Sequence, residues 1–126
     1  MNDQRMISPS TDDDLAELLA AECAVLILTR AACGVCAGYW SDVLALRGDE
    51  RLSGVAVGQL VLDAPGAARF KRDNPWLTDV DFLPYTVLYV RGEPVGDFAT
   101  TRTPYLLERL EAVRVRDEGE DGTRPP

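Results

Sequence analysis

Two cysteines separated by two residues, Cys33 and Cys36, have the clearest chemistry in this sequence. Two thiols at this spacing form a reversible dithiol/disulfide couple when the first lies at the N-terminus of a helix. Unpaired backbone N–H groups and the positive end of the helix dipole stabilise a thiolate at that position. The spacing therefore assigns two roles: Cys33 attacks a disulfide, and Cys36 resolves the mixed disulfide by closing the ring.

Zinc binding and a permanent structural disulfide are the other interpretations of such a pair. A zinc site usually needs four Cys or His ligands. The sequence has no histidine and one further cysteine, Cys23, which we expect in the first helix as a small buried hydrophobic side chain. Three cysteines are also far fewer than a secreted disulfide scaffold of this length would carry. We therefore expect a redox-active pair and no metal site, with Gly34 allowing the tight turn into the helix.

The composition argues against several classes of partner. The chain has 126 residues, a formal net charge of -8 and a pI near 4.4. Binding to nucleic acid or to an anionic membrane depends on clustered Lys and Arg, so neither is expected. No apolar run approaches the roughly 20 residues that cross a bilayer, and residues 1–14 lack the pattern of a secretory leader. We expect a cytoplasmic protein.

The pattern around the cysteine pair predicts the elements that hold it. Residues 24–29 form a continuous apolar run typical of a strand covered on both faces, and residues 34–46 have helical spacing. The cysteine pair therefore lies at a strand-to-helix turn. The other expected elements are helices over residues 11–22, 67–73 and 103–116, and strands over residues 55–62, 85–90 and 95–99. This order predicts an α/β domain whose sheet has a parallel part and an antiparallel C-terminal hairpin.

Both ends of the chain are expected to lie outside this domain. Residues 1–10 are predicted to be a flexible lead-in. Residues 117–126 are charged and rich in Gly and Pro, so they cannot bury enough apolar area to offset their chain entropy. We predict one domain over residues 11–116, followed by a disordered acidic tail.

Taken together, the motifs make the sequence resemble the thioredoxin family. The resemblance rests on CGVC at residues 33–36, LPYTVLY at residues 83–89 and the Gly-Glu pair at residues 92–93. It implies a thioredoxin-like fold with a central mixed sheet of about four strands flanked by helices. It also implies a cis Leu83–Pro84 peptide facing the cysteines, with the backbone of Leu83 pairing with a client strand.

Six positions depart from the family pattern. Ala32 replaces a tryptophan and Val35 replaces a proline, so surface recognition and redox poise are both open to change. Ile27 falls where the family has a buried aspartate that handles the proton of the resolving cysteine, and Gln59 falls where it has a lysine. Two departures concern the client groove, where Thr100 replaces a glycine and Tyr85 a threonine. A narrow range of clients is expected.

The segment before Pro84 is longer than in a minimal thioredoxin, and residues 76–83 lack a clear periodicity. It contains Trp76, Leu77 and Phe82. These side chains either form a hydrophobic rim beside Cys33 that selects a partner, or pack against the core, which we favour because aromatic side chains in loops usually act as anchors.

These features predict a thiol-disulfide oxidoreductase, with Cys33 and Cys36 catalytic. Ala32, Gly34, Val35, Leu83, Pro84 and Trp76 are the predicted substrate-binding residues. Protein disulfides are the expected clients, and a separate reductase or a low-molecular-weight thiol is the expected electron source, because no nucleotide-binding glycine pattern is present. No bound cofactor is expected, and the protein is expected to be a monomer. The alternatives are a non-catalytic thioredoxin-fold binding or chaperone-like module, a redox sensor, and a structural protein with a permanent disulfide.

Overall fold

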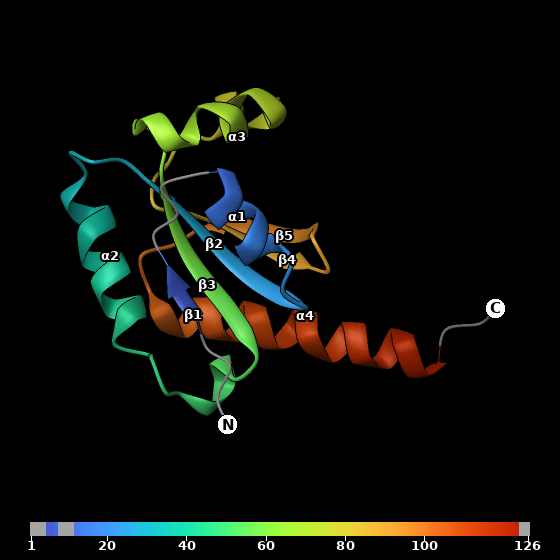
Figure 1. The fold of residues 1–126 in the computed structure, drawn as a ribbon. Helices are drawn as coiled ribbons and strands as arrows, with labels where there is room; N and C mark the ends of the chain where they lie inside the picture. The colour runs from blue at the N-terminus through green and yellow to red at the C-terminus, as the bar shows by residue number, and fades with distance from the viewer. Residues whose placement is uncertain (1–4, 8–11, 124–126) are drawn as a thin grey trace.

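A five-stranded mixed β-sheet with helices on both faces forms the centre of the molecule (Figure 1). The structure is a computed structural model, and it describes residues 5–7 and 12–123. In chain order the strands and α-helices are β1 (Arg5–Ile7), α1 (Asp12–Leu19), β2 (Cys23–Thr29), α2 (Gly34–Leu44), β3 (Val55–Val61), α3 (Ala68–Asp73), β4 (Tyr85–Val90), β5 (Glu93–Ala99) and α4 (Thr103–Thr123). Three short 3-10 helices lie between them, namely η1 (Glu50–Leu52), η2 (Pro65–Ala67) and η3 (Pro75–Asp79).

The strands are arranged in the order β1-β3-β2-β4-β5. β3 pairs in parallel with both β1 and β2. β4 pairs antiparallel with β2 and continues through a tight turn into β5, which completes an antiparallel hairpin. The predicted α/β class, the mixed sheet and the C-terminal hairpin are confirmed.

β2 is the central strand, and both of its faces are covered, because all seven of its residues are buried. Val25 and Ile27 pack with side chains of α2 and α4 on one face. Ala24, Leu26 and Leu28 pack with side chains of α1 and α3 on the other. Successive side chains of a strand point to opposite faces, so an uninterrupted apolar run is what a doubly covered strand requires.

The N-terminal part of the chain differs from the prediction in two places. Arg5–Ile7, which we expected within a flexible lead-in, forms β1 and adds a fifth strand to the sheet. A strand of three residues leaves almost no pattern in the sequence, and its partner β3 lies about fifty residues further along the chain. Cys23, which we expected in the first helix, is the first residue of β2, because α1 already ends at Leu19. Its predicted burial is confirmed.

At the C-terminus, α4 continues to Thr123, well beyond the predicted end near Arg116. In Figure 1 the last turns of this helix extend past the sheet. The prediction considered only the apolar area that the tail could bury. Once a helix is nucleated, however, each further residue adds a backbone hydrogen bond at little cost, so an existing helix can continue into a charged segment.

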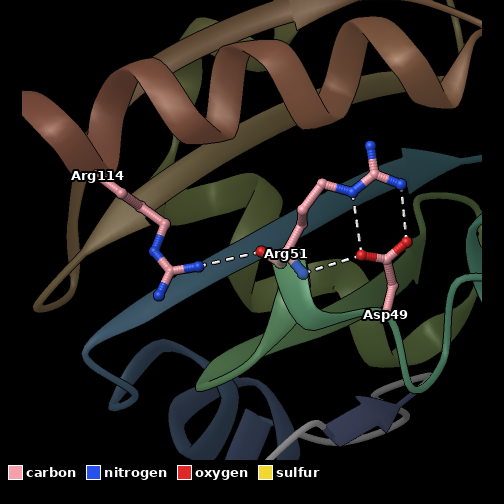
Figure 2. A network of polar contacts seen from close by, with 3 residues as sticks. All are labelled: Asp49, Arg51 and Arg114. Carbon is pink, nitrogen blue, oxygen red and sulfur yellow. Dashed lines mark hydrogen bonds and ion pairs between the residues drawn. The ribbon is translucent and has the colours of Figure 1, made fainter.

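The connection between α2 and β3 is held against α4 by a group of polar contacts (Figure 2). The guanidinium of Arg114 donates to the backbone oxygens of Arg51 at 3.0 Å and Ser53 at 3.2 Å. Arg51 in turn donates to the carboxylate of Asp49 through its backbone nitrogen and two side-chain nitrogens, at 2.8–3.0 Å. These hydrogen bonds lower the pKa of Asp49 to about 2.

Candidate active site

Cys33 and Cys36 lie at the turn between β2 and α2 and are joined by a disulfide bond. Cys33 is the N-cap residue of α2, and its sulfur accepts a hydrogen bond of 3.1 Å from the backbone N–H of Cys36. Side-chain acceptors are favoured at this position because the first N–H groups of a helix have no partner within the helix. The predicted strand, turn and helix around the pair are thus present.

The two sulfurs differ in their access to solvent. Cys33 is half-buried, whereas the Cys36 side chain is only 1% exposed and points into the core with Tyr39 and Val43. A protein disulfide can therefore approach Cys33 but not Cys36. Cys33 is the N-cap residue before the first turn of α2, whereas Cys36 lies within the helix on the same buried face as Tyr39 and Val43.

A depression of about 380 Å³ opens beside Cys33. Apolar side chains form most of its wall, and a cationic and an anionic side chain are also part of it. The lining residues are Arg30, Ala32, Cys33, Leu62, Leu77, Val80, Asp81 and Leu83. They come from the loop before α2, the end of β3 and the segment before β4, so the depression is shaped partly by the segment that was predicted to be an insertion.

The Leu83–Pro84 peptide is cis, as the resemblance implied. Pro84 is buried directly before β4, and Leu83 is half-buried in the wall of the depression. Because β2 and β4 are antiparallel, the first residues of β4 lie beside the last residues of β2, with Tyr85 opposite Leu28. This pairing brings the segment that contains Pro84 to the same end of the sheet as the cysteines.

Asp63 is a residue of the site that the sequence analysis did not single out. Its carboxylate accepts a hydrogen bond of 3.0 Å from the backbone N–H of Ala31, in the loop that leads to Cys33. The backbone N–H of Cys33 donates to the carbonyl of Arg30 at 3.2 Å within the same loop. The only sequence signal for Asp63 is that aspartate is common in turns, which does not reveal a partner so far away in the chain.

Neither a scan against protein-family models nor a search of curated proteins finds a match for this sequence. Solved structures of thioredoxins do match it. The Malassezia sympodialis thioredoxin aligns with a TM-score of 0.70 and 11% identity over 89% of this chain and 93% of that chain. Spinach chloroplast thioredoxin F (long form) aligns with a TM-score of 0.69 and 17% identity over 87% of this chain and 87% of that chain. Fasciola hepatica thioredoxin aligns with a TM-score of 0.63 and 21% identity over 86% of this chain and 97% of that chain.

The chain has the thioredoxin fold. The resemblance predicted from the motifs is thus confirmed at the level of the fold. Two residues of this thioredoxin fold near the candidate site, Ile27 and Gln59, differ from the residues that the resemblance implied. Ile27 is fully buried and is the register partner of Gln59. Gln59 accepts a hydrogen bond of 3.0 Å from the hydroxyl of Thr29. An isoleucine and a neutral glutamine therefore occupy the two positions for which the resemblance implied an aspartate and a lysine.

Most of the predicted binding residues lie at the cysteine end of this thioredoxin fold. Ala32 and Leu83 line the depression, and Val35 is 59% exposed in the first turn of α2. Gly34 has open space around the position of a missing Cβ, and its φ is not in the left-handed region. The turn therefore does not require glycine, contrary to our expectation. The effect of Gly34 is to leave the surface beside Cys33 open.

Trp76 does not lie in the wall of the depression. Its ring packs edge-on against Phe70 at 6.4 Å between centroids, and its indole N–H donates to Asn74 at 3.1 Å. Leu77 also packs against the core, and it lines the depression as well. Phe82 differs from both, because it is 72% exposed. The segment is thus anchored by Trp76 and Leu77 and presents Phe82 at the surface. A client-binding role for Trp76 stays a prediction.

The two departures in the predicted client groove make local hydrogen bonds. The Tyr85 hydroxyl donates to the carboxylate of Asp97 on the neighbouring strand. The Thr100 hydroxyl accepts a hydrogen bond from the backbone N–H of Arg102 at 3.1 Å.

Among residues 5–7 and 12–123, no cluster of three or more His, Cys, Asp or Glu side chains is placed to hold a metal ion. In the same part of the chain, no helix combines the length and the apolar character needed to span a bilayer.

Proposed function

We propose that this protein is a thiol-disulfide oxidoreductase that exchanges disulfides with protein clients through Cys33 and Cys36. The observation that supports this most directly is the disulfide at the N-terminus of α2, with one accessible and one buried sulfur. The accessible sulfur of Cys33 accepts a hydrogen bond from the backbone N–H of Cys36 at the N-terminus of α2. Such N–H groups stabilise the thiolate of Cys33 in the reduced protein. No bound cofactor is required for this chemistry.

The reaction needs two displacements at sulfur. In the reduced protein the Cys33 thiolate attacks one sulfur of the client disulfide, a bond forms between Cys33 and that sulfur, and the other client sulfur leaves as a thiolate that takes up a proton. Cys36 then loses its proton and attacks Cys33. The Cys33–Cys36 disulfide forms as the second client thiolate leaves. Two electrons have moved from the protein to the client, and a reductase or a small thiol restores them.

The surroundings of Cys33 support a narrow range of clients. The depression beside Cys33 is bounded by the segment before Pro84, and it has Arg30 and Asp81 in an otherwise mainly apolar wall. A client segment with an apolar residue next to its cysteine fits this wall. Ala32, Gly34, Val35, Leu83 and Pro84 are the proposed contacts, and we propose that the domain acts as a monomer in the cytoplasm.

A non-catalytic binding module or a redox sensor is the second candidate. Ile27 favours it, because a buried isoleucine cannot take a proton from Cys36 as a carboxylate would. In that case Cys33 and Cys36 form a disulfide, but the protein does not catalyse disulfide exchange with clients.

The test is the reduction of insulin by dithiothreitol with the native protein, Cys33→Ser and no protein. A rate well above both controls supports exchange catalysis through Cys33. Because a narrow client range would lower this rate, a small aromatic disulfide, the thionitrobenzoate dimer, is tested in parallel. Exchange is overturned if the native protein reacts with the small disulfide no faster than free glutathione does. Cys36→Ser, which leaves the mixed disulfide unresolved, then identifies the clients by mass spectrometry.

A further inference from the structure

Two hydroxyl groups are buried on the face of the sheet that α2 covers. Tyr39 on α2 is 2% exposed and Thr86 on β4 is 0% exposed. In the part of the chain that the structure describes, neither hydroxyl makes a hydrogen bond of good geometry to a protein group. Burying a hydroxyl without a partner costs free energy, so each such group in a folded protein requires an explanation.

The two hydroxyls are close to each other. Burial raises the pKa of Tyr39 to about 12, and the Thr86 hydroxyl is near enough to oppose this rise as a hydrogen-bond donor. The phenol of Tyr39 is therefore neutral at physiological pH and has a proton to donate. Thr86 is placed to donate in turn to the oxygen of Tyr39.

Tyr39 is also next to the buried thiol position. Cys36, Tyr39 and Val43 form the buried stripe of α2, and Cys36 and Tyr39 are three residues apart. Residues at this spacing have Cβ atoms roughly 5–6 Å apart, and helical side chains lean toward the N-terminus of the helix. The ring of Tyr39 therefore leans toward Cys36, which lies one turn closer to the N-terminus.

Thr86 approaches the same place from the sheet. It lies two residues after Pro84, so both face the same side of the chain. It is also the register partner of Ile27, whose side chain packs in the core under α2. Tyr39 and Thr86 thus lie on the face of the sheet that α2 covers, and Tyr39 follows Cys36 by one turn on the buried stripe of that helix.

The other elements packed here supply little charge. Among the residues whose burial is described, Thr29 and Thr86 are the buried polar side chains other than tyrosine, and Thr29 already donates to Gln59. From α4, the guanidinium of Arg109 lies 5.7 Å from the ring centroid of Phe98, which is the register partner of Thr86. No buried carboxylate lies in the described part of the core to assist Cys36. Among the described residues, the buried side-chain atoms without a hydrogen-bond partner are the hydroxyls of Tyr39 and Thr86 and the Nε of Arg109, so the two hydroxyls are the neutral donors available to a charge on this sulfur.

We propose that Tyr39 is a catalytic hydrogen-bond donor to the Cys36 thiolate and that Thr86 is a positioning residue behind it. This rests on the proposed thiol-disulfide exchange. In the mixed disulfide the Cys36 S–H bond breaks and its proton passes to water, while the Tyr39 hydroxyl donates to the sulfur and the Thr86 hydroxyl donates to Tyr39. The Cys36 sulfur then bonds to Cys33, and the bond from Cys33 to the client breaks. A hydrogen bond to the charged form favours that form, so the resolving thiolate becomes available near neutral pH.

The test separates attack by Cys33 from resolution by Cys36. The reduced protein is mixed with excess thionitrobenzoate dimer in a stopped-flow instrument. The first thionitrobenzoate is released when Cys33 attacks, and the second when Cys36 displaces the group bound to Cys33. The reaction of Cys23 is measured on Cys33→Ser/Cys36→Ser and subtracted.

We expect Tyr39→Phe to slow the second release by about tenfold near pH 7, while the first release changes by less than about twofold. The deficit should shrink as the pH rises, because the Cys36 thiolate then forms without help. Thr86→Val should slow the second release to a smaller extent, and Thr86→Ser should restore it. A purely structural role for these hydroxyls would not single out one of the two phases or change its pH profile.

The matched control is Tyr89→Phe, which removes the hydroxyl of another buried tyrosine but lies on the opposite face of the sheet. It should leave both releases unchanged. Circular dichroism establishes that each variant is folded. A second release within about twofold of the native rate in folded Tyr39→Phe and Thr86→Val would overturn the proposal. A native protein that shows no second release would instead overturn the exchange function itself.

Discussion

The carboxylate of Asp63 accepts a hydrogen bond of 3.0 Å from the backbone N–H of Ala31. This contact joins the segment after β3 to the loop that leads from β2 to Cys33. The two strands are parallel neighbours, so their ends meet at the same edge of the sheet. Asp63 therefore fixes the loop before the proposed nucleophile without touching either sulfur.

Removing this acceptor should impair exchange through the loop. We expect Asp63→Ala to lower the rate of the first thionitrobenzoate release by about two- to fivefold, because a hydrogen bond that orders the loop is lost. Asp63→Asn keeps an oxygen acceptor and should retain most of the native rate. If Asn and Ala slow the reaction equally, the negative charge of Asp63 matters and the hydrogen bond to Ala31 does not.

Phe82 should contribute to client binding and not to stability. Its side chain is 72% exposed between Asp81 and Leu83, which both line the depression beside Cys33. We expect Phe82→Ser to raise KM for a protein client by roughly threefold or more and to change the free energy of unfolding by less than about 0.5 kcal/mol. Val115→Ser on α4 is the control, since Val115 is 63% exposed. Equal effects of both variants on KM would contradict a specific role for Phe82.

The sequence predicted those parts of the fold that leave a local pattern. The apolar run before the cysteine pair indicated a doubly covered strand, and the two short strand patterns over residues 85–90 and 95–99 indicated the hairpin. β1 was missed because its three residues gain their structure from pairing with β3. The extent of α4 was missed because propagation adds a backbone hydrogen bond per residue even where the added turns bury little apolar area.

For the candidate site, the sequence predicted the cysteine pair but not the contacts between side chains that are far apart in the chain. Cys33 and Cys36 are recognisable because their spacing is itself the chemical signal. Tyr39 falls within the helix predicted over residues 34–46, but nothing in the sequence shows that its hydroxyl lies near Thr86 across the core. The contact of Asp63 with Ala31 was missed for the same reason. Contacts between side chains far apart in the chain depend on strand register, which no local pattern specifies.

The buried stripe of α4 should be a main source of stability. Leu106 is fully buried in the core on the α2 side of the sheet. We expect Leu106→Ala to lower the free energy of unfolding by about 2–5 kcal/mol, because the cavity it leaves adds to the lost burial. Val115→Ala, on the exposed face of the same helix, should cost less than about 0.5 kcal/mol. Denaturation in urea measures both, and a loss below about 1 kcal/mol for Leu106→Ala would contradict the packing of α4 on the sheet.

Two buried tyrosines should make the oxidised protein sensitive to alkali. Burial raises the pKa of Tyr39 and of Tyr89 to about 12, above their ordinary value of 10.0. Between these values the unfolded chain has lost protons that the folded protein keeps, so stability is fully present below about pH 10 and falls as the pH rises toward about 12.

Each tyrosine should add up to about 1.4 kcal/mol per pH unit to the decrease of the free energy of unfolding with rising pH. The measurement is urea denaturation of the oxidised protein at several pH values, for the native chain and for Tyr39→Phe/Tyr89→Phe. Phenylalanine cannot ionise, so the double variant should lose less stability over this range than the native protein does. Parallel curves for the two proteins would mean that the phenols ionise in the folded state with their ordinary pKa, and hence that the core around Tyr39 admits water.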